Sequence, residues 1–137
     1  MKSDSAEIIP PPVDTEFFTP GGERGDRILT VAALVPYKRV EVAIAVARQL
    51  GRGIDIVGTG PKRAHLEREA RGGDVRFLGW LPREELREAY RRAAVLLVPN
   101  IEDFGMATVE ALACGTPAVG LAASGTADII RFRAACI

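Results

Sequence analysis

The sequence is poor in the residues from which metal sites and disulfide scaffolds are built. Its 137 residues include only two cysteines and one histidine. Cys114 and Cys136 lie far apart without the spacing of metal ligands, and His65 falls in a highly charged segment. Zinc sites and disulfide frameworks need several such residues at short intervals. We therefore expect no metal site and no disulfide scaffold.

The sequence also lacks a charge bias and a long hydrophobic run. Its 18 basic residues balance 18 acidic ones, so the net charge is zero at pH 7. Nucleic-acid-binding domains carry a basic excess, and this balance argues against a nucleic-acid partner. No apolar run approaches the roughly 18 residues of a membrane-spanning helix, and the first residues lead into no signal-peptide core. These absences predict a soluble, cytoplasmic protein.

The composition is that of one globular domain, with 47% hydrophobic and 26% charged residues. Residues 1–27 are rich in proline and glycine and predict an extended arm or interdomain linker. Within this arm we expect Phe17 and Phe18 to dock on the body. Residues 28–130 carry the pattern of a folded domain, and residues 131–137 form an atypical or truncated tail.

Short apolar runs alternate with helical patterns through that domain. The runs are rich in β-branched residues and apolar throughout, which is typical of strands covered on both faces of a sheet. The predicted strands are residues 28–35, 54–58, 75–79, 95–98 and 117–121, and the predicted helices are residues 38–50, 61–71, 82–93 and 104–114. Strictly alternating strands and helices predict an α/β fold with a doubly wound, five-stranded parallel sheet.

The most informative feature is a pair of carboxylates in one short segment. Glu102 and Glu110 have seven residues between them, and they straddle Gly105, which opens the fourth predicted helix. That helix is apolar on nearly every side with Glu110 its only charge, so we expect it to be buried and Glu110 to need a hydrogen-bonding partner. Its start presents free N–H groups and a positive dipole end, which favour a phosphate. A phosphate there and hydroxyls near both carboxylates describe a sugar nucleotide.

The other suggestive elements follow the predicted strands, at the edge where parallel sheets bind ligands. Lys38 and Arg39 follow the first strand, where Lys38 is either a solvated charge or, as we prefer, a phosphate contact. Asp103 is either the cap of the fourth helix or a ligand contact, and Thr108 is more typical of a core position. Cys114 has no histidine near it in the pattern, which argues against a nucleophile.

Glycine-rich turns follow the second and third strands. Gly58-Thr59-Gly60 opens like a dinucleotide-binding turn, but Arg63 stands where the third glycine of that motif belongs. We therefore interpret Gly58 and Gly60 as a tight turn that lets the backbone approach a ligand. Gly79 and Trp80 follow the third strand, where Trp80 either stacks on a base or packs against the arm.

Together these segments resemble the C-terminal, donor-binding domain of retaining glycosyltransferases of the GT-B fold, glycosyltransferase family 4. The similarity rests on residues 11–17, 35–38, 56–61, 77–79 and 102–117. Glu-Asp-Phe-Gly at 102–105, with Val-Pro-Tyr-Lys-Arg at 35–39, resembles a mannosyltransferase-like subgroup. The resemblance implies a Rossmann-like domain that binds a nucleotide-diphospho-sugar and uses neither a metal nor another cofactor.

The resemblance also assigns roles at the matching positions. Lys38 and Glu102 are the implied catalytic residues, because Lys38 neutralises the leaving diphosphate and Glu102 holds hydroxyls of the donor sugar. Glu110 is implied to hold the ribose hydroxyls. The remaining implied substrate-binding residues are Arg39, Gly58, Gly60, Gly79, Trp80, Asp103, Phe104, Gly105 and Met106.

The chain departs from the family pattern at both ends and at Ala33. Ala33 replaces a basic residue that the family carries, for which Arg39 is a candidate substitute. The chain starts at the implied interdomain linker, so the acceptor-binding N-terminal domain is missing, and residues 131–137 do not resemble the expected continuation.

The implied whole enzyme transfers a hexose, such as mannose from GDP-mannose, to a glycan or to a lipid-linked acceptor at a membrane surface. We expect this chain to be inactive alone, because it would supply only the donor-binding part. A sugar-nucleotide epimerase fragment and a non-catalytic module that senses nucleotide-sugars remain as alternatives.

Overall fold

The computed structural model of this chain describes residues 12–102, 104–125 and 129. Its five parallel strands lie in the order β3-β2-β1-β4-β5 and alternate with helices along the chain, which confirms the predicted α/β fold. The strands are β1 (Ile28–Val31), β2 (Ile54–Val57), β3 (Val75–Gly79), β4 (Val95–Val98) and β5 (Ala118–Gly120). The helices are the 3-10 turn η1 (Pro36–Lys38), α1 (Val40–Gln49), α2 (Arg63–Glu69), α3 (Arg83–Arg92) and α4 (Met106–Ala113). In this part of the chain no helix is long and apolar enough to cross a membrane.

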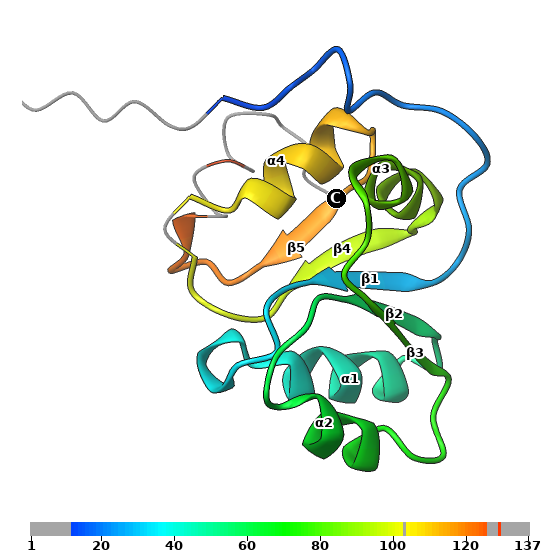
Figure 1. Cartoon of the computed structure of the whole chain (residues 1–137), viewed down its shortest axis with the longest axis vertical. Coiled ribbons are helices and arrows are strands. Elements are labelled where there is room, and N and C mark those ends of the chain that lie inside the picture. Colours follow the sequence, from blue (N-terminus) through cyan, green and yellow to red (C-terminus); the bar gives the residue numbers. More distant parts are fainter. Residues whose placement is uncertain (1–11, 103, 126–128, 130–137) are drawn as a thin grey trace, which may run out of the picture.

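The sheet is sandwiched between two helical layers, with α1 and α2 on one face and α3 and α4 on the other (Figure 1). Successive side chains of a strand point to opposite faces, and β1 shows the result. Ile28 belongs to the core under α1 and α2, whereas Leu29 belongs to the core under α3 and α4. The central strand therefore contributes to both cores.

The expectation that every strand is covered on both faces is wrong for β5, where Val119 is 54% exposed, and for β3. This strand lies at the edge of the sheet and pairs only with β2. Its residues alternate between half-buried and exposed, and Leu78 is 39% exposed. The sequence contains a signal of this exposure that the prediction did not use, because the charged Arg76 interrupts the run and is exposed.

The first strand and the first helix are shorter than predicted, because a tight turn separates them. Strand β1 ends at Val31 rather than at residue 35, and η1 begins at Pro36, which has no N–H to donate to a sheet. Arg39 then adopts a left-handed conformation with φ of 54°, so α1 begins at Val40 rather than at residue 38.

The arm packs against α3 and α4, as predicted for its two phenylalanines. Phe18 is 5% exposed and joins the core under α3 and α4, while Phe17 is partly buried beside it. Asp14 holds this part of the arm in place: its Oδ1 accepts from the Phe17 N–H at 3.0 Å, and its Oδ2 pairs with Arg83 at 2.7 Å. The Arg83 guanidinium in turn lies 4.1 Å from the centre of the Phe17 ring.

Candidate functional site

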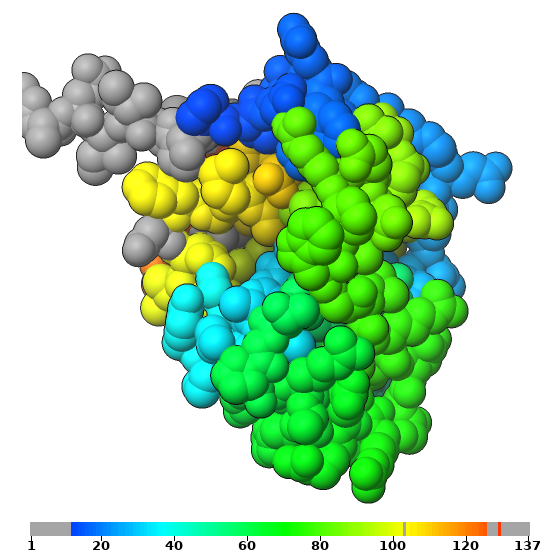
Figure 2. Space-filling view, viewed as in Figure 1, coloured from blue at the N-terminus to red at the C-terminus, as the bar shows by residue number. Residues whose placement is uncertain are grey.

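The site lies where the chain switches direction across the sheet. Strand β1 lies between β2 and β4. The chain leaves β1 toward α1 on one face and leaves β4 toward α4 on the other. The carboxyl ends of two strands that diverge in this way leave a crevice between their loops. On the surface, the loop after β1 (cyan) lies next to the segment after β4 (yellow) (Figure 2).

Two predicted site residues meet across this crevice. Lys38, at the end of η1, and Glu102, after β4, form an ion pair with Nζ and Oε1 2.6 Å apart. Their side chains are only 16% and 24% exposed. A pair shielded to this degree is screened less by salt than a surface pair. The charges of the two implied catalytic residues are therefore balanced in the structure.

A cavity of about 460 Å³ opens at this ion pair. It is lined by Val31, Tyr37, Lys38, Val98, Ile101, Glu102, Phe104, Gly105, Met106, Ala107 and Thr108. The cavity thus gathers five predicted site residues that are described: Lys38, Glu102, Phe104, Gly105 and Met106. Phe104 and Met106 are 51% and 37% exposed and form part of its apolar rim.

The start of α4 forms one wall of this cavity. Gly105 precedes the helix in a left-handed conformation with φ of 64°, and no side chain caps the first turn. The first N–H groups of a helix have no partner within the helix, so this turn offers donors to an anion. Thr108 lies in the same turn, and its hydroxyl is buried without a hydrogen-bond partner in the described structure. Asp103, predicted as a cap or a ligand contact, lies outside the described residues.

Glu110 opens into a second cavity, of about 340 Å³. This cavity is lined by Pro12, Val13, Asp14, Phe18, Trp80, Leu81, Arg83, Leu86, Met106 and Glu110. Met106 lines both cavities, so the two adjoin along the first turn of α4. Trp80 is 74% exposed and stands at the rim.

The partner of Glu110 is Tyr90 of α3, which was not among the predicted site residues. The Tyr90 hydroxyl donates to Oε2 of Glu110 at 2.8 Å. Burial raises the pKa of Tyr90 far above its usual value, so the phenol stays protonated and acts as a donor. Burial also raises the pKa of the Glu110 carboxyl, while the Tyr90 hydrogen bond and the Arg83 charge oppose that rise.

The expectation that α4 is buried on nearly every side is wrong. Only Thr108 and Ala111 are fully buried in the helix. Another face of α4 borders a groove of about 360 Å³ that it shares with the arm. Its helical residues are Val109, Leu112 and Ala113. The helix is apolar on that face although the described residues cover the face only in part.

Gly58 and Gly60 support the loop that carries Lys38 and line neither cavity. A Cβ at Gly58 would lie 1.8 Å from the Ala32 carbonyl oxygen, and one at Gly60 would lie 2.4 Å from that of Leu34. The Leu34 N–H also donates to the Thr59 carbonyl at 2.9 Å. The close approach that we predicted toward a ligand is thus made toward the loop after β1.

The remaining predicted residues lie around the site rather than in it. Arg39 is exposed and lines neither cavity. Gly79 shapes the turn before Trp80, with φ of 68°, and its carbonyl accepts from the Gly58 N–H at 2.8 Å. Among the described residues, no group of three or more histidine, cysteine, aspartate or glutamate side chains is arranged to hold a metal ion.

Ser124 is a supporting residue whose role the sequence analysis missed. Its hydroxyl accepts from the Glu102 N–H at 2.8 Å, and the Gly125 N–H donates to the Glu102 carbonyl at 2.8 Å. The segment after β5 therefore fixes the backbone of Glu102. Its position was the available signal, since Ser124 follows the fifth predicted strand at the ligand-binding edge, but no role was predicted for it.

Residues 25–135 match the sequence profile of the family described as glycosyl transferases group 1. The chain belongs to this glycosyltransferase family. Its fold is the Rossmann-like half of a GT-B glycosyltransferase, as predicted.

The relatives of this glycosyltransferase chain include two actinobacterial enzymes. A D-inositol 3-phosphate glycosyltransferase of Kribbella flavida is 37% identical over 150 residues, covering 87% of this chain and 35% of that protein. A GDP-mannose-dependent alpha-(1-6)-phosphatidylinositol dimannoside mannosyltransferase of Mycobacterium tuberculosis is 41% identical over 92 residues, covering 63% of this chain and 24% of that protein. The chain thus spans about a third or less of the length of these relatives.

Solved glycosyltransferase structures share the fold. AviGT4, a glycosyltransferase involved in avilamycin A biosynthesis, superposes with a TM-score of 0.83 at 23% identity, covering 94% of this chain and 42% of that one. A mutant of TarM from Staphylococcus aureus, solved in complex with fondaparinux, alpha-GlcNAc-glycerol and UDP, superposes with a TM-score of 0.67 at 18% identity. It covers 82% of this chain and 25% of that one.

Proposed function

We propose that this chain is the donor-binding domain of a retaining glycosyltransferase and that it binds a nucleotide-diphospho-sugar in the two adjoining cavities. The observation that carries the proposal is the Lys38–Glu102 ion pair beside the uncapped start of α4. A cation and free helix N–H groups suit a diphosphate, while a carboxylate suits sugar hydroxyls. Both kinds of group face the same 460 Å³ cavity.

In this proposal Lys38 turns from Glu102 to the diphosphate when the donor binds. As the bond between the anomeric carbon and the diphosphate oxygen breaks, negative charge grows on the leaving diphosphate, and Lys38 and the α4 N–H groups stabilise it. Glu102, freed from the lysine, accepts hydrogen bonds from the hexose hydroxyls. The unpartnered Thr108 hydroxyl supports the assignment, because it is a further donor beside the same helix turn.

The nucleoside belongs to the second cavity. Glu110 is its only described acidic lining residue besides Asp14, whose carboxylate is already engaged by Arg83 and by the backbone of the arm. We assign the ribose hydroxyls to Glu110 and the base to the exposed face of Trp80. This order places the ribose between base and diphosphate, as the covalent structure of the donor requires.

The relative named as a GDP-mannose-dependent mannosyltransferase supports mannose as the hexose and GDP as the carrier. The same name includes a phosphatidylinositol dimannoside, which supports a lipid-linked acceptor and an enzyme that works at a membrane surface. We propose that this surface faces the cytoplasm. An epimerase function has no comparable support, because the relatives named above are glycosyltransferases.

Binding is tested by titrating the chain with GDP, UDP and ADP while recording NMR chemical shifts. We expect saturable shifts at Lys38, Gly105 and Glu110, with affinities in the micromolar to millimolar range. Lys38→Met should weaken binding about tenfold or more, since a charged hydrogen bond is worth about 1.5–3 kcal/mol. The matched control is Lys62→Met, because Lys62 lines neither cavity. Equal losses in both variants, or shifts confined to α1 and α2, would refute the assigned site.

We further propose that the chain alone transfers no sugar, because catalysis requires donor and acceptor to be held together in a water-excluded site. An assay with radiolabelled GDP-mannose and UDP-glucose should show no turnover by this chain. Transfer to an added glycan or lipid acceptor without a second polypeptide would contradict this and indicate a complete small enzyme.

A further inference from the structure

We propose that Tyr90 is the positioning residue for Glu110 and that its hydroxyl holds the carboxylate in the orientation that receives the ribose. This inference rests on the proposed function, in which Glu110 binds the ribose hydroxyls. It adds a residue from α3, outside the segment from Glu102 to Glu110. Three observations carry it. Tyr90 is held rigidly, its hydroxyl points toward the second cavity, and it engages only one of the two carboxylate oxygens of Glu110.

Tyr90 has little freedom to move. Its side chain is fully buried, in a core that includes Leu96, Val98 and Ala111. Phe18 of the arm packs edge-on against its ring, with centroids 6.0 Å apart. Its backbone carbonyl accepts a hydrogen bond from the Thr116 hydroxyl. A hydroxyl mounted on a ring held in this way is a fixed donor rather than a mobile one.

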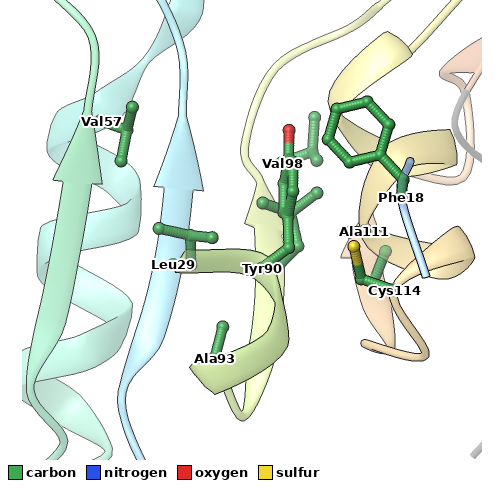
Figure 3. Packing of buried hydrophobic residues seen from close by; sticks show 10 residues of the cluster. Phe18, Leu29, Val57, Tyr90, Ala93, Val98, Ala111 and Cys114 are labelled. Carbon is green, nitrogen blue, oxygen red and sulfur yellow. The ribbon is translucent and has the colours of Figure 1, made fainter. Parts of the chain in front are cut away.

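The fixed hydroxyl points toward the nucleoside cavity. In the close view of the core, the Tyr90 ring runs along β4, and its oxygen lies toward the end at which the strand arrows terminate (Figure 3). This is the edge where the site lies. Phe18 packs against Tyr90 and also lines the second cavity. The arm therefore forms one wall of that cavity and supports the tyrosine ring.

The hydrogen bond engages one oxygen of Glu110 and leaves the other available. Oε2 accepts from Tyr90, and no hydrogen bond to Oε1 occurs within the described part of the chain. The Tyr90 hydroxyl donates its single proton to this carboxylate oxygen. It therefore stabilises the ionised carboxylate without occupying the oxygen that a ribose needs.

The experiment compares GDP with 2′,3′-dideoxy-GDP, which lacks both ribose hydroxyls, by calorimetric titration of the full 137-residue chain. The unmodified chain should bind GDP about tenfold or more tightly than the dideoxy analogue, as expected for hydrogen bonds to a charged group. In Tyr90→Phe this preference should shrink to about threefold or less. The loss should come from weaker GDP binding, while binding of the analogue stays nearly constant.

Thr116→Val is the matched control. It removes a buried hydrogen bond to the backbone of the same tyrosine and leaves the Tyr90–Glu110 contact in place. A merely structural role of Tyr90 predicts that both variants weaken the two nucleotides equally and keep the preference for GDP. The positioning role predicts that only Tyr90→Phe loses it.

The outcomes separate this inference from the proposed function. If the unmodified chain binds no nucleotide, the proposed function fails and the inference fails with it. If it prefers GDP and Tyr90→Phe keeps the full preference, only the positioning role is overturned. If it binds both nucleotides equally, the ribose assignment of Glu110 is overturned while diphosphate binding stands.

A second measurement covers the case in which Tyr90→Phe does not fold. The chain has only two tyrosines, so ¹³C labelling of the ring carbon that bears the hydroxyl gives two assignable signals. In the unmodified chain GDP should shift the Tyr90 signal, whereas the dideoxy analogue should not. Equal shifts with both nucleotides would overturn the proposal.

Discussion

At the scale of single residues, the Lys38–Glu102 pair has two opposite effects on a donor. The carboxylate holds the lysine close to the cavity, but it also competes with a diphosphate for the lysine charge. A carboxylate and a phosphate near one another repel, and this repulsion is stronger in a shielded site than in water. Under the proposed function, we therefore expect Glu102 to favour binding of the donor sugar and to disfavour binding of the diphosphate.

This opposition predicts that Glu102→Gln raises the affinity for GDP but not the affinity for GDP-mannose. GDP should bind about threefold to tenfold more tightly, because Lys38 is released and the repulsion is removed. GDP-mannose should lose this gain or bind more weakly, because the amide replaces a charged acceptor for the sugar hydroxyls. Calorimetry with both ligands measures the change. Glu84→Gln, on the exposed surface of α3, is the control, and parallel changes for GDP and GDP-mannose would contradict the expectation.

Glu110→Gln should change how the stability of the chain depends on pH. Burial raises the pKa of Glu110 above its ordinary value of 4.5, so the fold favours the protonated form. An acid with a raised pKa in the folded state loses stability as the pH rises through that pKa. The variant, which does not titrate there, should therefore match the unmodified chain at low pH and exceed it near neutrality.

Denaturant unfolding of both proteins at several pH values tests this expectation. The lowered pKa of Asp14 acts in the opposite direction, but it is common to both proteins and cancels in the comparison. A variant that is less stable than the unmodified chain at neutral pH would show that Glu110 is primarily a structural acid. Normal nucleotide binding by such a variant would also refute the ribose assignment.

At the scale of elements, the turn between β2 and α2 supports the loop between β1 and α1. The N–H groups of Ala32 and Leu34 donate to the carbonyls of Val57 and Thr59, both at 2.9 Å. The two backbones approach so closely that glycine is needed at position 58, where φ is 136°. Lys38 therefore depends for its position on an element that touches neither cavity.

Gly58→Ala should destabilise the chain by about 3 kcal/mol or more, because the new Cβ would overlap the Ala32 carbonyl and the backbone would be strained. Gly72→Ala is the control: φ is also positive at 81°, but nothing lies within 4 Å of the new Cβ. Gly72→Ala should lower the free energy of unfolding by about 1 kcal/mol. This value measures the cost of the left-handed backbone conformation without a steric overlap. Similar costs for the two variants in thermal melts would contradict the close approach.

The order of elements was predictable from the sequence, and their ends and exposure were not. Apolar runs and helical periodicity located the five strands and four α-helices of the described residues, because these patterns follow from local geometry, but they did not reveal the 3-10 turn η1. The left-handed Arg39 displaced the start of α1, and the exposed Arg76 was not interpreted as a sign that β3 is an edge strand. Candidate site residues could be named from the sequence where they directly follow a predicted strand. Tyr90 was missed because a tyrosine on the apolar stripe of a helix is interpreted as core until its hydroxyl partner is known.

At the scale of the whole molecule, the domain has two cores separated by the sheet, and the arm completes one of them. The core under α1 and α2 is built from residues of the domain body alone. The core under α3 and α4 includes Phe18, which reaches it from the arm. The arm is thus an integral part of the fold on the side of the site.

Phe18→Ala should lower the free energy of unfolding by about 3–5 kcal/mol, since it leaves a cavity in that core. Phe104→Ala is the matched control, because Phe104 is 51% exposed and its truncation should cost about 0.5 kcal/mol or less. Urea unfolding of both variants measures the difference. An equally small cost for Phe18→Ala would show that the arm is a detachable linker.

The docking of the arm has a consequence for how the chain is made. During synthesis the arm leaves the ribosome before the helices against which it packs, and Arg91, which binds Thr19, follows that residue by 72 residues. The core under α1 and α2 needs no residue beyond Leu97, so it can assemble while Phe18 is still exposed. Phe18 is fully covered only after Ala111 of α4 and Cys114, the residue that follows the helix, have been synthesised. The nascent chain therefore carries an exposed aromatic arm while the residues between Phe18 and α4 are synthesised, and chaperones can bind this arm until α4 emerges.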